Sequence, residues 1–268
     1  MKRNLFKQAL AQGRPQIGLW STLPSPYVTE LLGGSGFDWI LLDAEHAPTD
    51  VPLMLHQLQA LAAARPAAGA PTTPVVRPPW NDPVLIKRYL DIGAQNLLIP
   101  FVQSSDEAAA AVASCRYAPA GIRGMGGSVR ASDYGRNTGY VATAERDLGI
   151  FVQIETADAL EQLEAIAAVE GIDGVFIGPA DLSASMGYAQ EPKHPKVTAA
   201  IDDAINRIKR CKKAPGILMV DEVRARECLA NGALFVAVAV DLVLLRSAAD
   251  ERAAFYKKTL AAAASSAY

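Results

Sequence analysis

The sequence predicts one (β/α)8 barrel, a TIM barrel of the α/β class, as a single domain over residues 1–268. Short apolar runs rich in branched residues alternate eight times with stretches of helical periodicity. No change in composition divides the chain at its middle, and α/β barrels commonly reach this length as one domain. The rival is a doubly wound open sheet, whose glycine-rich first turn has no counterpart after the first predicted strand.

In chain order, we expect a short first helix and then eight pairs of a strand and a helix. The first helix covers residues 2–13 and is ended by Gly13. The predicted strands are short, apolar and suited to a buried parallel sheet: 16–20, 39–43, 73–77, 96–101, 149–155, 173–178, 215–220 and 234–240. The helices that follow them are predicted over 26–34, 51–64, 82–92, 105–115, 156–169, 195–212, 222–231 and 241–262.

Two stretches interrupt this alternation. Residues 65–74, RPAAGAPTTP, are rich in Pro and Ala and are predicted to form a surface loop. Residues 117–140 form a long glycine-rich connection between the fourth helix and the fifth strand. Connections of this length are usually functional or mobile, so the segment is either an active-site lid or a flexible loop. No Gly-Lys-Ser/Thr follows its glycines, which argues against a phosphate-binding loop.

The composition excludes several classes of function. A net charge of −2 gives no electrostatic basis for binding nucleic acid or an anionic membrane. The three cysteines are scattered without ligand spacing and are expected to be reduced thiols. The first residues lack the apolar core of a signal peptide, and the longest apolar run is too short to span a bilayer. We therefore expect a soluble cytoplasmic protein.

Two carboxylates follow two successive strands of the predicted barrel. Glu155 ends the strand 149–155, and Asp181 follows the strand 173–178 within the segment GPAD. A βαβ unit brings the ends of both strands to one face of the sheet, so the two side chains are expected to emerge side by side. Two converging acids repel each other unless a cation lies between them or one keeps its proton. A divalent ion is favoured, and two helix-capping acids are the alternative.

Further polar residues are predicted at the same face, where barrel enzymes place their chemistry. Trp20 ends the first strand, and Asp43 ends the second and leads into His46. A role in proton transfer is favoured for His46 over a structural one. Arg77 leaves the buried third strand and needs an anion. That anion is either Asp43 or Glu45, in a salt bridge, or a substrate carboxylate or developing enolate.

The positions of the lysines exclude one mechanism of carbon–carbon bond cleavage. No lysine ends a predicted strand. An aldolase that works through a Schiff base needs a lysine at that face of the barrel. If this chain generates a carbanion next to a carbonyl group, a metal ion must therefore act as the electron sink.

Seven segments together resemble the 4-hydroxy-2-oxoheptanedioate aldolase family, class II pyruvate aldolases related to the 2-dehydro-3-deoxyglucarate aldolases. They are GRPQIGLW, GFDWILLDAEHAP, PVVRPPWNDP, YAPAGIRG, FVQIET, GIDGVFIGPADLSASMGY and GALFVAVAVD. The resemblance covers nearly the whole chain. It departs at the loop RPAAGAPTTP, which is longer than expected, and over residues 126–143, which do not align cleanly.

The resemblance implies a metal site and a set of roles around it. Mg, Mn or Co is expected on Glu155 and Asp181, with pyruvate chelating the metal through its carboxylate and keto oxygens. The GPAD turn (Gly178, Ala180 and Asp181) would hold the substrate carboxylate together with Gln153. Pro179 has no N–H, so Ala180 and Asp181 are the donors. Arg77 would steady the enolate oxygen, and His46 would be the base, acting through a water on the metal. Asp91 would orient His46, and Asp43 and Trp20 would support the site.

The implied partners are a small 2-oxo acid and an aldehyde. The same resemblance implies that the last helix is exchanged between subunits and that dimers assemble into a homo-hexamer.

Three other functions stay open at this stage. A citrate-lyase-like or malyl-CoA-like lyase would share the barrel and the metal, but it would need a basic surface for CoA phosphates. A transferase acting on phosphoenolpyruvate would need more cationic residues than Arg77 and Arg123 at the strand ends. A non-catalytic metal-binding barrel would have no need of His46 and Arg77 beside the two acids.

Overall fold

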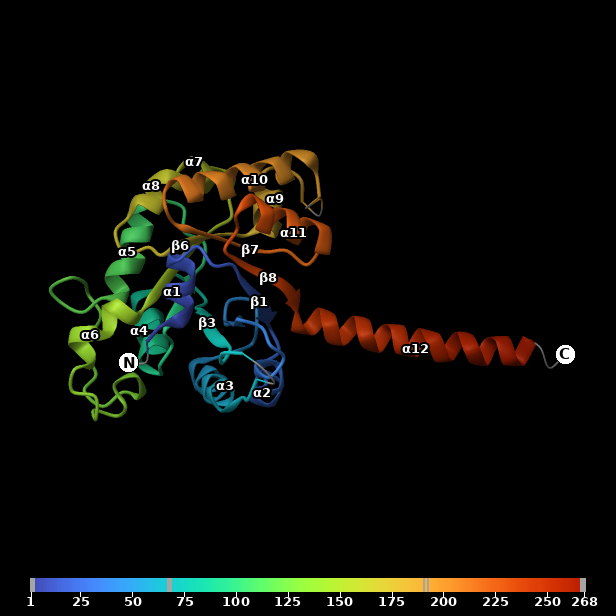
Figure 1. Ribbon diagram of the computed structural model, residues 1–268, viewed down its shortest axis with the longest axis horizontal. Helices are drawn as coiled ribbons and strands as arrows, with labels where there is room; N and C mark the ends of the chain where they lie inside the picture. Colours follow the sequence, from blue (N-terminus) through green and yellow to red (C-terminus); the bar gives the residue numbers. More distant parts are fainter. Residues whose placement is uncertain (1–2, 67–68, 190, 192, 266–268) are drawn as a thin grey trace.

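Eight parallel strands close into a barrel in their sequence order, β1 to β8, and helices surround them in the computed structural model (Figure 1). The structure describes residues 3–66, 69–189, 191 and 193–265. The strands are β1 (Gln16–Ser21), β2 (Trp39–Asp43), β3 (Thr73–Arg77), β4 (Asn96–Ile99), β5 (Gly149–Ile154), β6 (Gly174–Ile177), β7 (Ala214–Leu218) and β8 (Phe235–Val240). The predicted fold class is confirmed, and each strand lies where the sequence predicted it, to within two residues at either end.

The helices also follow the predicted order. They are α1 (Leu5–Ala11), α2 (Pro26–Gly33), α3 (Val51–Ala63), α4 (Pro83–Asp91), α5 (Ser105–Cys115), α6 (Tyr140–Asp147), α7 (Ala157–Glu161), α8 (Leu163–Ala168), α9 (Pro179–Ser185), α10 (Pro195–Arg210), α11 (Glu222–Asn231) and α12 (Asp241–Ser265). The first helix is shorter than predicted, and residue 2 lies outside the described residues. The single helix predicted over 156–169 is two short helices that meet at Gln162.

Two helices were not predicted because they are short. The seven-residue α9 begins in the GPAD segment, where Gly178 is the N-cap and Pro179 occupies the first helical position that proline favours. The eight-residue α6 begins at Tyr140, at the end of the predicted loop 117–140. Helices of two turns show too little periodicity to stand out in a sequence.

The interior of the barrel explains which side chains reach its upper face. Successive side chains of a strand point to opposite sides, so residues two apart share a side. Trp39 and Leu41 of β2, Val75 of β3 and Phe151 of β5 belong to one buried apolar cluster. By the same alternation, Asp43, Arg77, Gln153 and Glu155 continue these rows of inward side chains at the carboxyl ends of the strands. The apolar cluster is thus the floor of the polar site.

Helix α1 closes the opposite end of the barrel (Figure 1). Phe6 is almost completely buried and packs edge-on against Phe151 and Phe235. Asn4 caps α1 and donates a hydrogen bond to Asn96 Oδ1 at 2.7 Å. The amino-terminal end of the barrel is therefore filled, which leaves the carboxyl-terminal end for chemistry.

The segment 117–140 is not a lid over the strand ends of its own barrel, and this corrects the first of the two interpretations. It joins α5 to β5, so it lies at the amino-terminal face. Arg123 donates a hydrogen bond to Asp91 at the end of α4 (2.8 Å), and Arg130 donates one to the carbonyl of Ile92 (2.7 Å).

The other predicted loop, 65–74, is described only in part. Residues 67–68 lie outside the described residues, and β3 already begins at Thr73.

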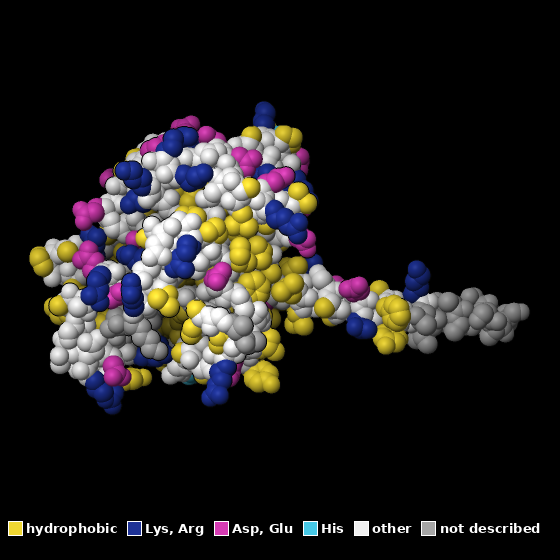
Figure 2. Space-filling model, viewed as in Figure 1, with side chains coloured by type: hydrophobic (Ala, Val, Ile, Leu, Met, Phe, Trp, Pro, Cys, Tyr) yellow, Lys and Arg dark blue, Asp and Glu magenta, His cyan; other side chains and the backbone are white. Residues whose placement is uncertain are grey.

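Helix α12 points away from the barrel instead of packing on it (Figure 1). Its side chains are exposed from Leu242 to Lys258, including Leu245, Phe255 and Tyr256. Figure 2 shows hydrophobic side chains around the base of this helix and on the adjoining surface of the barrel. The second half of β8 is only half-buried, whereas β2, β4, β5 and β6 are buried throughout. None of the helices in the described part of the chain combines the length and apolarity that a membrane crossing requires.

Candidate active site

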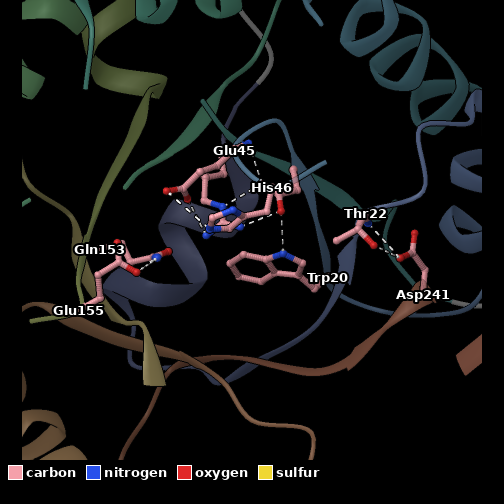
Figure 3. A network of polar contacts seen from close by, with 9 residues as sticks. Trp20, Thr22, Glu45, His46, Gln153, Glu155 and Asp241 are labelled. Atoms are coloured by element: carbon pink, nitrogen blue, oxygen red, sulfur yellow. Dashed lines mark hydrogen bonds and ion pairs between the residues drawn. The ribbon is translucent and has the colours of Figure 1, made fainter. Parts of the chain in front are cut away.

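Polar side chains at the carboxyl-terminal end of the barrel form three groups of contacts, of which the largest is a network that joins the first three strands and the connection after β2 (Figure 3). Its centre is Arg77, whose side chain is 6% exposed. Asp43 and Arg77 are directly paired residues in the register of β2 and β3. This pairing explains why the two side chains meet. Arg77 donates from Nε to Asp43 Oδ1 at 2.9 Å and from a terminal nitrogen to Oδ2 at 2.7 Å.

Two further groups surround the Arg77 guanidinium. The indole of Trp20 lies beneath it, 4.6 Å from the guanidinium carbon to the ring centroid, and donates a hydrogen bond to Asp43 Oδ2 at 3.3 Å. The other terminal nitrogen of Arg77 lies 2.8 Å from Glu45 Oε2, as an ion pair without hydrogen-bond alignment. The salt bridge that the sequence left as one interpretation of Arg77 is therefore present, with both acids.

The two carboxylates beside Arg77 respond to it differently. Burial opposes the charged form of Asp43, but the hydrogen bonds and charge of Arg77 outweigh it and lower the pKa of Asp43. For Glu45, burial outweighs the charge of Arg77 and raises the pKa. Nearby negative charge on Asp43 and Asp181 raises it further. The sequence predicted Glu45 only as a possible salt-bridge partner of Arg77, and that contact is present.

Glu155 is the buried acid of the site, with 4% of its surface exposed. Its Oε1 accepts a hydrogen bond from the backbone N–H of Phe101 at 2.9 Å, and its Oε2 accepts one from Gln153 Nε2 at 2.6 Å. Burial raises the pKa of Glu155 to about 7. The Gln153 hydrogen bond opposes this shift, and the charges of Glu45 and Asp181 add to it. The site thus holds excess negative charge.

The GPAD segment, residues 178–181, lies next to Glu155. A larger residue at position 178 would displace Glu155, because an added Cβ would lie 2.8 Å from Glu155 Cβ and 2.6 Å from its Oε2. Ala180 and Asp181 are exposed in the first turn of α9, where backbone N–H groups have no acceptor within the helix. Asp181 is close enough for its charge to raise the pKa of both Glu155 and Glu45. The structure therefore brings Glu155 and Asp181 to the same place, as the order of strands implied.

The residues present fit a divalent cation. Glu155 and Asp181 offer carboxylate oxygens, and the amide oxygen Oε1 of Gln153 is buried without a hydrogen-bond partner. Burial raises the pKa of Glu155, and the negative charges of Glu45 and Asp181 raise it further. In the described part of the chain, no three His, Cys, Asp or Glu side chains form a complete ligand set. Mg²⁺ is often held by one or two carboxylates, with substrate and water completing the shell. Two acids are thus enough for an ion shared with substrate.

His46 and Asp91 do not meet within the chain. His46 lies in the connection after β2, with its side chain 67% exposed and Nε2 3.9 Å from Glu45 Oε1. Asp91 is the last residue of α4, which runs back to the amino-terminal face, and it pairs there with Arg123. Within one chain Asp91 therefore does not reach His46, and its role as an orienting partner stays a prediction. Helix periodicity could not show which end of the barrel the residue would occupy.

Asp241, at the end of β8, closes the barrel. Its carboxylate accepts hydrogen bonds from Ser21 Oγ (2.7 Å) and from the hydroxyl and backbone N–H of Thr22 (3.0 and 2.9 Å). These contacts join the end of β8 to the end of β1. The position of Asp241 beside the site is explained by this structural role.

The raised pKa of Glu155 predicts a pH-dependent stability for the chelator-treated protein. Between about pH 4.5 and 7 the folded chain keeps a proton that the unfolded chain has lost, so the free energy of unfolding should fall as the pH rises. The slope is at most about 1.4 kcal/mol per pH unit. Urea unfolding across this range measures it. Glu155→Gln should flatten the dependence, and an equal slope in that variant would assign it to another group.

Comparison with known proteins shows that the sequence of this chain is similar to those of aldolases. Residues 16–248 match the family model described as HpcH/HpaI aldolase/citrate lyase. The chain is 56% identical over 252 residues to a 4-hydroxy-2-oxo-heptane-1,7-dioate aldolase of Klebsiella pneumoniae, covering 94% of this chain and 93% of that protein.

Solved structures give the same result for the fold. An HpcH/HpaI aldolase/citrate lyase family protein from Burkholderia cenocepacia superposes with a TM-score of 0.90 at 37% identity, over 95% of this chain and 99% of its own. An HpcH/HpaI aldolase from Desulfitobacterium hafniense superposes with a TM-score of 0.85 at 28% identity, over 94% and 96%.

Proposed function

Because the chain belongs to the HpcH/HpaI aldolase/citrate lyase family, it is a carbon–carbon lyase of the class II pyruvate aldolase type, and we propose how its site carries out the reaction. The proposed reaction is the reversible aldol cleavage of a 4-hydroxy-2-oxo acid to pyruvate and an aldehyde. The proposed substrate is 4-hydroxy-2-oxo-heptane-1,7-dioate, the compound named for the similar Klebsiella enzyme. The observation that carries the proposal is that two neighbouring acids, Glu155 and Asp181, lie at the same end of the barrel as a buried arginine, Arg77.

The cofactor proposed for this site is Mg²⁺, Mn²⁺ or Co²⁺, held by Glu155 and Asp181. When bound, such an ion polarises the 2-keto oxygen of the substrate and offsets the charge of the enolate. The raised pKa of Glu155, caused by burial and increased by the charges of Glu45 and Asp181, supports the assignment, because a cation beside the ionised carboxylate offsets both effects.

Substrate binding is assigned to the groups around the two acids. Gln153 and the backbone N–H groups of Ala180 and Asp181 are proposed to hold the substrate carboxylate. Arg77 is proposed to donate to the developing enolate oxygen. Arg77 has five N–H groups, and only two of them donate well-aligned hydrogen bonds to Asp43. The guanidinium therefore has donors left for substrate. Asp43 and Trp20 hold the guanidinium in place, because they contact its edge and its face.

The proton transfer is assigned to His46. Removal of the C4 hydroxyl proton lets the C3–C4 bond break, which releases the aldehyde and leaves the electron pair on the pyruvate enolate. Return of the proton to C3 gives pyruvate, so the base is regenerated. His46 is exposed at the open end of the barrel, where an entering substrate can reach it.

A coupled lactate dehydrogenase assay tests the function. The purified protein with 4-hydroxy-2-oxo-heptane-1,7-dioate and Mg²⁺ is expected to oxidise NADH through released pyruvate. Citryl or malyl thioesters should give no comparable rate, and a preference for them would favour the citrate-lyase-like alternative. Borohydride with pyruvate should leave the enzyme active, because none of the eight described strands ends at a lysine. Inactivation would reveal a Schiff-base mechanism.

The assembly is proposed to be a homo-hexamer built from three dimers, with α12 exchanged between subunits. The support is the extended α12 with its exposed apolar side chains, together with the half-buried second half of β8. Apolar surface of this extent is costly to leave in water. The helix of one subunit is proposed to cover the exposed part of the barrel of another.

Truncation after Arg246 tests this assembly, since it keeps Asp241 and its hydrogen bonds. The shortened chain is expected to lose the hexamer and to run as smaller species or to aggregate, as measured by size-exclusion chromatography with light scattering. A matched full-length control, Arg252→Ala, changes one exposed charge on the same helix and should remain hexameric. A hexamer formed equally well by the truncated chain would contradict the exchange.

A further inference from the structure

The main chain contacts the candidate metal site at Phe101. Two residues after the end of β4, Phe101 adopts a φ of 54°, in the left-handed region that a large L-residue rarely occupies. Its N–H donates the 2.9 Å hydrogen bond to Glu155 Oε1. The next N–H, of Val102, donates to the carbonyl of Gln153 at 3.0 Å. Two successive amides of the connection after β4 therefore bind β5 and its terminal acid.

An aromatic residue keeps a left-handed backbone conformation only if contacts with the surrounding structure offset its free-energy cost. The ring of Phe101 stacks on the ring of Trp80, with centroids 5.6 Å apart and planes 29° apart. Trp80 lies in the connection between β3 and α4, three residues after Arg77, and is 52% exposed. An indole that is half in water adds little to the core, so its contact with Phe101 is its most specific interaction.

We propose that Trp80 is a positioning residue for the metal site. By stacking on Phe101 it holds the left-handed backbone, and the N–H of Phe101 in turn fixes Glu155 Oε1 for a divalent cation. A carboxylate oxygen that accepts one hydrogen bond keeps a second lone pair for the metal. Groups that orient a ligand in this way typically contribute about 10–100-fold to metal affinity. The inference rests on the proposed function, because it requires Glu155 to be a metal ligand.

The experiment measures the dissociation constant of Mn²⁺ by the electron paramagnetic resonance of the free ion, without substrate and without turnover. Trp80→Ala is expected to weaken binding about tenfold, and Trp80→Phe, which keeps a stacking ring, to recover most of that loss. Glycine enters the left-handed region without penalty. In a Phe101→Gly background, Trp80→Ala should therefore have no further effect on the Mn²⁺ dissociation constant.

A second comparison needs no change at Trp80. Phe101→Ala removes the ring and keeps the backbone penalty, so it should weaken Mn²⁺ binding about tenfold, whereas Phe101→Gly should bind Mn²⁺ more tightly than Phe101→Ala. Tyr134 is the matched control, an aromatic residue at a φ of 55° whose ring contacts Arg136. Tyr134→Ala should leave the Mn²⁺ dissociation constant within about twofold of the wild type.

Three results would overturn the inference. The first is wild-type Mn²⁺ affinity in Trp80→Ala. The second is an equal loss in Trp80→Ala whether residue 101 is Phe or Gly, and the third is equal affinity in Phe101→Ala and Phe101→Gly. Glu155→Gln separates this failure from that of the proposed function. If Glu155→Gln also binds Mn²⁺ as tightly as the wild type, the assignment of the metal site to Glu155 is wrong. If Glu155→Gln loses binding, only the role of Trp80 is rejected.

Discussion

EDTA is expected to abolish pyruvate release by this protein, and Mg²⁺ or Mn²⁺ in excess to restore it. With the ion removed, Glu155 is only partly ionised at neutral pH, because burial and the charges of Glu45 and Asp181 raise its pKa to about 7. Arg77 is then the only cationic group in the described network that can face the enolate, and it already pairs with Asp43 and Glu45. Its charge alone cannot offset that of an enolate as well. The coupled lactate dehydrogenase assay measures the effect.

Glu155→Gln is the matched variant for this experiment. It keeps the shape of the side chain and removes the charge that a metal requires. Its activity should be as low as that of the EDTA-treated enzyme, and added Mg²⁺ should not restore it. Because metal binding requires the ionised carboxyl group, the affinity of the wild type for Mn²⁺ should rise with pH up to about 7. Full turnover in the presence of excess EDTA would contradict the metal-dependent mechanism.

Arg77→Ala is expected to lower kcat at least about a hundredfold while Mn²⁺ still binds. Losing one donor to a developing oxyanion costs about 100–1,000-fold in comparable enzymes. The variant should also be less stable, because Asp43 and Glu45 lose their counter-ion in a largely buried place. Breaking a buried ion pair from one side costs about 3–5 kcal/mol. Thermal unfolding and steady-state kinetics measure the two losses separately.

Two variants separate catalysis from stability. Arg77→Lys keeps the charge but cannot reproduce the two-point contact with Asp43, so its rate should lie between those of Arg77→Ala and the wild type. Arg207 makes a similar two-point contact with Glu164 on the outer shell of helices. Arg207→Ala should leave kcat within about twofold of the wild type, since surface changes away from a site have small effects. An unchanged kcat in Arg77→Ala would exclude its role at the enolate.

Much of the candidate site could be predicted because it lies where strands end. A barrel gathers these ends at one face, so the polar residues after apolar runs identify the site without any knowledge of contacts. Glu155 and Asp181 are the best example, since they follow neighbouring strands. The alternation of side chains could have added more. Gln153 and Glu155 share the side of Phe151, which lies in the interior cluster of the barrel.

The contacts within the site could be predicted only in part, since a salt bridge of Arg77 to Asp43 or Glu45 was one of two alternatives that the sequence left open. Arg77 binds Asp43 because the two residues are register partners, and register depends on how the strands align. Glu45 joins the site because its connection folds over Arg77. Phe101 reaches Glu155 through a backbone conformation that its residue type disfavours. Each of these depends on segments far apart in the chain.

The sequence by itself determined the number and order of the strands, the face at which the chemistry lies and the two acids that follow β5 and β6. These properties depend on local periodicity and on the alternation of strand and helix, which neighbouring residues carry. Only the tertiary structure decided that Asp91 and the segment 117–140 lie at the opposite end of the barrel. The physical reason is that hydrogen bonds and packing between distant segments select these placements, and no local pattern encodes them.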